Sequence, residues 1–197
     1  MATAYVATFG SLAVAAYGIA ARLEYILVPI AFGIGGALTA MVATNLGARQ
    51  AERAKRVTWA GAGLVAALTG FIGLAAALWP QAWMALFSSD AAVQAVGSTY
   101  LRIVGGCYGF FGLALALFFA SQGAGRLRWP LIASTARLIV VALGGWLALH
   151  VAGGPPEMMY AVIALSLLVM GVMLCAATHL ADWATPAPQH LPIRAKA

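Results

Sequence analysis

The chain has 197 residues, of which 63% are hydrophobic and only 8% are charged, and its mean hydropathy is +0.94. Soluble domains carry about 25% charged residues, so this composition excludes a water-soluble globule and predicts an integral membrane protein. The net charge of +6 is gathered in short clusters between apolar runs, which favours a role in membrane topology and argues against nucleic-acid binding.

Six apolar runs are long enough to cross about 30 Å of hydrocarbon as helices. The predicted spans are residues 4–21, 25–46, 57–79, 101–120, 131–151 and 159–181. Residues 80–100 predict an interfacial segment, because Trp83 lies near its start and Asp90 can cap a helix that begins at Ala91. A short re-entrant segment is the alternative for this stretch. The predicted fold class is therefore all-α, a polytopic membrane domain over residues 1–181 followed by a disordered cytoplasmic tail over 182–197.

Basic residues mark one side of the predicted membrane domain. The connections after the second and fourth spans carry six cations, at Arg49, Arg53, Lys55, Arg56, Arg126 and Arg128. The positive-inside rule makes these connections cytoplasmic, and six spans then bring both ends of the chain to the cytoplasmic side. We therefore expect a multi-pass protein of the cell membrane, meaning the inner or plasma membrane. Its expected partners include the lipid bilayer itself.

The sequence contains few side chains that could act in catalysis or bind a metal ion. The three histidines and two cysteines have no metal-ligand spacing, and no nucleophile elbow or P-loop is present. The sequence predicts neither an enzyme nor a bound cofactor or metal. Arg137 is the clear intramembrane charge, and it either snorkels to the cytoplasmic headgroups or faces a cavity or an acidic partner. Glu24 and Glu157 fall at the ends of predicted spans, so no carboxylate is expected inside one.

Several segments, in order along the chain, resemble the multidrug and toxic compound extrusion (MATE) family. They are residues 15–22, 29–36, 45–49, 53–56, 86–90, 100–103 and 122–125, with Pro130 after the last. The likeness is to the second half of the family's members, which have twelve helices in two six-helix lobes around a central cleft. It implies a MATE-like C-terminal lobe and antiport of organic cations or drugs against protons or sodium ions. Xenobiotic efflux and multidrug resistance would follow from that activity.

The resemblance also implies that the chain is incomplete alone and pairs with a second six-helix lobe on the same or another chain. Some members use acids in the first and fourth helices of this lobe, and the corresponding spans, 4–21 and 101–120, contain none. No coupling residue is therefore carried over. Five residues are expected either to line the substrate cleft or to pack between helices: Tyr17, Asn45, Tyr108, Gln122 and Arg137. The alternative function is a non-transporting subunit that stabilises or regulates a partner membrane protein.

Overall fold

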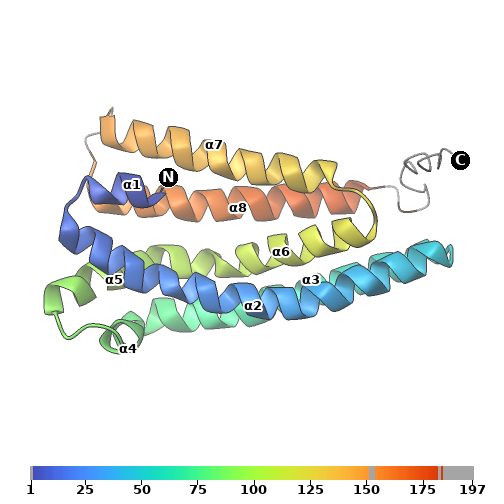
Figure 1. The fold of residues 1–197 in the computed structure, drawn as a ribbon, viewed down its shortest axis with the longest axis horizontal. Helices are drawn as coiled ribbons and strands as arrows, with labels where there is room; N and C mark the ends of the chain where they lie inside the picture. The colour runs from blue at the N-terminus through green and yellow to red at the C-terminus, as the bar shows by residue number, and fades with distance from the viewer. Residues whose placement is uncertain (1, 151–153, 182, 184–197) are drawn as a thin grey trace, which may run out of the picture.

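The computed structural model describes residues 2–150, 154–181 and 183, and this part of the chain contains helices and no strand. Figure 1 shows the long helices running side by side in one elongated bundle. The helices are α1 (Ala2–Ala7), α2 (Ser11–Gly47), α3 (Ala51–Leu78), α4 (Pro80–Ala85), α5 (Ala91–Val104), a 3-10 turn (Gly105–Cys107), α6 (Tyr108–Gly123), α7 (Arg128–His150) and α8 (Pro156–Leu180).

Five stretches of the described chain are long and apolar enough to cross a membrane: α2, α3, the continuous Ala91–Gly123, α7 and α8. The prediction of an all-α polytopic membrane protein is confirmed. The number of spans is five where the sequence predicted six. The difference arises at the beginning of the chain, where α1 has only six residues and is too short to cross the bilayer.

The predicted spans 4–21 and 25–46 are wrong as separate elements, because α2 is one helix of 37 residues that runs through the expected connection. Residues 22–24 contain no glycine, proline or asparagine that would favour a turn. The break lies earlier, at Gly10, whose φ of 95° suits glycine. Glu24 therefore lies well inside a spanning helix.

An odd number of spans changes the topology. The α2–α3 connection, the α6–α7 connection and the end of α8 share one end of the bundle, which we call the basic end (Figure 1). The start of α2 lies at the opposite end, together with α4, the end of α7 and the start of α8. The prediction that both chain ends share one side relied on an even span count, and five candidate spans remove that support.

The stretch after α3 contains the expected cap but divides differently. The Asp90 carboxylate accepts a hydrogen bond from the Ala92 amide at 2.8 Å and so caps α5. However, α5 is not a separate interfacial helix, because it continues through the 3-10 turn into α6 and forms the first part of a spanning stretch. The short α4 precedes it, and the Trp83 indole donates to the Ile19 carbonyl of α2 at 3.2 Å.

Helices α3 and α6 pack through glycines. A Cβ built on Gly70 would lie 3.3 Å from the Gly109 Cα, and one built on Gly73 would collide with the Gly105 carbonyl and the Tyr108 side chain. Close backbone approach of this kind is a common means of helix association in lipid, where apolar burial contributes little. The seam holds Tyr108 in a fixed position at the centre of the bundle.

Candidate functional site

Glu24 is the centre of a polar cluster between helices. Its Oε1 atom accepts a hydrogen bond from the Tyr100 hydroxyl at 3.1 Å and another from the Tyr108 hydroxyl at 3.4 Å. Both tyrosines are fully buried, whereas Glu24 is half-buried. Helices α2, α5 and α6 thus meet at one carboxylate. An ionisable group inside a spanning helix is costly unless it has partners, and it usually marks a functional site.

Two further tyrosines pack against the ring of Tyr100. The Tyr17 ring meets the Tyr100 ring edge-to-face at 5.3 Å between centroids, and the Tyr160 ring meets Tyr100 in the same way at 5.2 Å. Tyr17 precedes Glu24 by seven residues, which puts both on one face of α2. The Tyr160 hydroxyl is buried and has no hydrogen-bond partner among the described residues.

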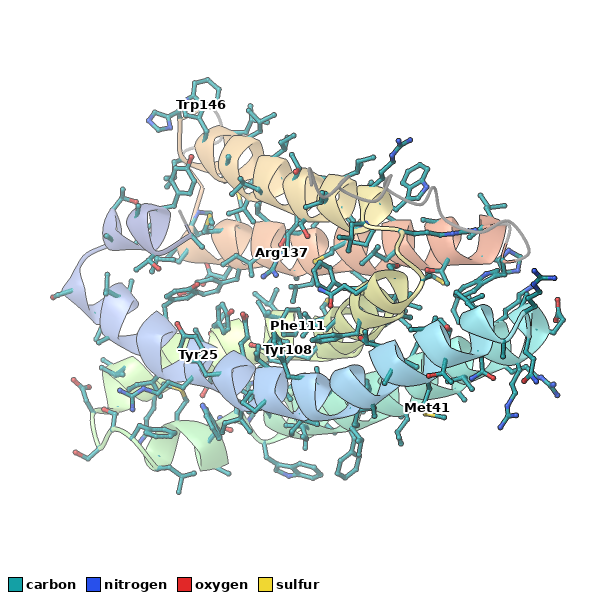
Figure 2. All side chains as sticks on the ribbon, turned by 45° about the vertical axis from the view of Figure 1, so that its right-hand side comes forward. Tyr25, Met41, Tyr108, Phe111, Arg137 and Trp146 are labelled. Carbon is teal, nitrogen blue, oxygen red and sulfur yellow. The ribbon has the colours of Figure 1, made fainter. Side chains whose placement is uncertain are left out.

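Arg137 of α7 completes the cluster. Its guanidinium carbon lies 5.4 Å from the centre of the Phe111 ring, within the range of a cation–π interaction. The same charge interacts electrostatically with Glu24 and with Tyr17. Figure 2 shows Arg137 in the interior of the bundle, on the side of α7 that faces Tyr108 and Phe111. Of the placements considered from the sequence, the guanidinium adopts the one inside the bundle, over the Phe111 ring, and not at the headgroups.

These side chains are called the Glu24 cluster below. Its members are Tyr17, Glu24, Tyr100, Tyr108, Phe111 and Arg137. Three of the five residues expected to line a cleft therefore come together: Tyr17, Tyr108 and Arg137.

The other two expected residues lie elsewhere. Asn45 donates its side-chain amide to the Met41 carbonyl of its own helix at 2.7 Å. Gln122 is exposed in the last turn of α6. Asn45 follows Glu24 by 21 residues, which is about 32 Å along a helix, so the structure separates both residues from the Glu24 cluster and puts them near the basic end.

Sequence reasoning missed Glu24, Tyr100 and Phe111. The expectation that no carboxylate lies inside a span is wrong, and the reason is the connection assigned at residues 22–24. Two signals pointed the other way. The first is the absence of a turn-forming residue there, and the second is the spacing of Tyr17 and Glu24, which lines up polar side chains on one helical face. The positions of Tyr100 next to Glu24 and of Phe111 next to Arg137 depend on tertiary packing.

The chemistry of the Glu24 cluster suits a positive charge. One carboxylate oxygen is oriented by two tyrosine hydroxyl donors, and the Tyr17 ring packs against one of these tyrosines. A carboxylate of this kind can take up a proton or pair with a cation, and aromatic faces attract cations further. Arg137 supplies one such cation from the chain itself.

Comparisons with known proteins agree with this architecture. The MatE family model matches residues 1–147. An FAD transporter of Shewanella oneidensis is 28% identical over 131 residues, which cover 66% of this chain and 29% of that protein. The chain thus spans less than a third of that relative's length.

A solved structure shares the fold. It is a MOP superfamily transporter from Pyrococcus furiosus, with a TM-score of 0.75, 15% sequence identity, and coverage of 91% of this chain and 40% of that one. At this identity the likeness concerns the fold alone. The family model, in contrast, covers most of the sequence, including α2, α5, α6 and most of α7. The chain belongs to the MatE family of membrane transporters.

Proposed function

We propose that this chain is one lobe of a MatE-type antiporter that exports an organic cation or drug in exchange for protons or sodium ions. The observation that carries the proposal is the carboxylate of Glu24, held inside a spanning helix by two tyrosine hydroxyls. We assign the Glu24 cluster as the cation site of this lobe.

A single carboxylate can serve both halves of an exchange. In a low-dielectric site an unpaired carboxylate is unfavourable, so it binds either a proton or another cation. Occupation by one excludes the other, and this competition is the physical basis of antiport. Glu24 is half-buried, so part of its side chain is uncovered in this lobe. The rings of Tyr17 and Phe111 favour a cation with an apolar or aromatic body.

A second lobe completes the transporter in this proposal. The chain spans 40% of the solved transporter that it resembles. Half-buried polar groups at Tyr17, Glu24 and Arg137 are poorly suited to face lipid. A further six-helix lobe, on the same or another polypeptide, would enclose them. We orient the lobe in the cell membrane with its basic end in the cytoplasm, so that the start of α2 lies on the other side.

A second substrate class follows from the relative that is named an FAD transporter. FAD is an anion that carries a planar aromatic ring system. The tyrosine rings would accept the ring system, and Arg137 would bind a phosphate group. In that case Glu24 would not bind the substrate directly.

Binding measurements separate the two substrates. The full chain in lipid nanodiscs is titrated with tetraphenylphosphonium and, separately, with FAD, using Glu24→Gln, Arg137→Gln and the exposed control Arg102→Gln. The organic-cation proposal expects Glu24→Gln alone to abolish binding of tetraphenylphosphonium. The FAD alternative expects Arg137→Gln alone to abolish binding of FAD. Absence of binding for both ligands would instead favour a non-transporting subunit.

A further inference from the structure

We propose that Arg137 is a tethered cation that occupies the Glu24 cluster when no substrate is bound, so that an incoming organic cation must displace it. This inference rests on the proposed function of the cluster as a cation site. It adds a gate that is built into the chain and that sets the affinity of the site.

The position of Arg137 is the first argument. It lies nine residues after Arg128, which is about 14 Å along α7 from the basic end. A long side chain at that depth usually extends toward the headgroups. The guanidinium instead lies over the Phe111 ring, inside the bundle. The Glu24 cluster therefore offers this cation a better environment than the membrane interface does.

The Glu24 cluster has one negative charge. Glu24 is its carboxylate, and Arg137 interacts electrostatically with it. The Phe111 ring that the guanidinium covers is also a surface that an organic cation would use. A second cation would meet the repulsion of the first and would find that ring face covered. Arg137 and a cationic substrate thus compete for the same partners.

The same inference is supported by the way in which α7 is attached. It is the least buried of the candidate spans, and its main packing partner is α8, with a smaller contact on α1. Tyr5 of α1 supports that contact by donating its hydroxyl to the Ala142 carbonyl at 2.9 Å. The Arg137–Phe111 contact connects α7 to α6 across the interior. Displacing Arg137 would loosen this connection, so substrate binding would be coupled to the position of α7.

The test is a titration of the full chain in nanodiscs with tetraphenylphosphonium. The variants are Arg137→Met, which keeps an unbranched apolar side chain without the charge, Arg137→Lys, and Glu24→Gln. Arg102→Met is the matched control for loss of an exposed arginine. If Arg137 occupies the cluster in about nine molecules of ten, Arg137→Met binds the probe about tenfold more tightly than the original chain. Arg137→Lys should stay close to the original affinity.

The outcomes are distinguishable. Tighter binding in Arg137→Met, lost again in the double variant Glu24→Gln/Arg137→Met, supports the tethered cation. Binding that is unchanged or weaker in Arg137→Met overturns it, while the cation site itself stands as long as Glu24→Gln still abolishes binding. If neither the original chain nor Arg137→Met binds the probe, the proposed cation site and the tethered cation are both refuted.

Discussion

Replacing Gly73 with alanine should disturb both the bundle and the Glu24 cluster. A Cβ at this position would collide with the Gly105 carbonyl and would come within 2.7 Å of the Tyr108 Cβ. The first of these neighbours is backbone and cannot rotate away. Overpacking of this kind costs about 1–3 kcal/mol, so we expect a loss of stability in that range. Tyr108 would be pushed along with its helix, which lengthens a hydrogen bond to Glu24 that is already 3.4 Å.

Gly63 provides the matched control. It lies in the same helix, α3, and a Cβ built on it meets nothing within 4 Å. Alanine has the higher helix propensity by about 1 kcal/mol, so Gly63→Ala should be neutral or slightly stabilising. The assay is the free energy of unfolding of each variant in mixed micelles, followed by helical circular dichroism, together with tetraphenylphosphonium affinity in nanodiscs.

The two readouts make the reasoning refutable. Gly73→Ala should lower both stability and affinity, and Gly63→Ala should lower neither. Equal stability of the two variants would mean that the α3–α6 seam is not as close as described. A stability loss without any loss of affinity would mean that Tyr108 does not orient the Glu24 carboxylate.

Three other predictions follow from the same geometry. Tyr100→Phe and Tyr108→Phe should each weaken binding of the cation about fivefold, because each removes a hydrogen bond worth about 1 kcal/mol. The exposed Tyr25→Phe is the control. If Tyr100→Phe and Tyr108→Phe bind the cation as tightly as this control, the role of the hydroxyls is refuted. Vesicles that contain only this chain should show no ion-driven export of cationic dyes in a fluorescence assay, and robust export would contradict the need for a second lobe. Single cysteines at Ser11 and Gln50, in a chain whose Cys107 and Cys175 are replaced by alanine, should react with an impermeant maleimide from opposite sides of the membrane, and labelling of both from one side would contradict α2 as a single span.

Much of the fold follows from hydropathy. Three predicted spans, 57–79, 131–151 and 159–181, each overlap one helix, α3, α7 and α8, with ends that differ by a few residues. Long apolar runs form helices in lipid, because the hydrogen bonds of their backbone N–H and C=O groups must then be made within the helix. Which of these segments form spanning helices therefore depends on their local sequence and can be predicted from it.

The sequence-based prediction of the spans is wrong where tertiary contacts stabilise charged side chains inside a helix. Arg22 and Glu24 have the same local composition as a short connection, and hydropathy alone cannot separate a loop from charged residues within a helix. In the structure each has a distant partner: the Arg22 guanidinium lies 5.1 Å from the Phe87 ring, and Glu24 accepts from Tyr100 and Tyr108. Those partners come from 65 or more positions away along the chain. The candidate site was only partly predictable for the same reason.

Chemical modification of Glu24 tests the central claim most directly. A membrane-permeant carbodiimide reacts with protonated carboxyl groups in apolar surroundings, and mass spectrometry identifies the modified residue. We expect modification at Glu24 and protection of that residue by tetraphenylphosphonium. The exposed Glu52 and Glu157 at the helix ends serve as internal controls, because they do not lie in apolar surroundings and should react much less. Modification of Glu24 that is unaffected by tetraphenylphosphonium, or modification no greater than that of Glu52 and Glu157, would contradict a cation site at Glu24.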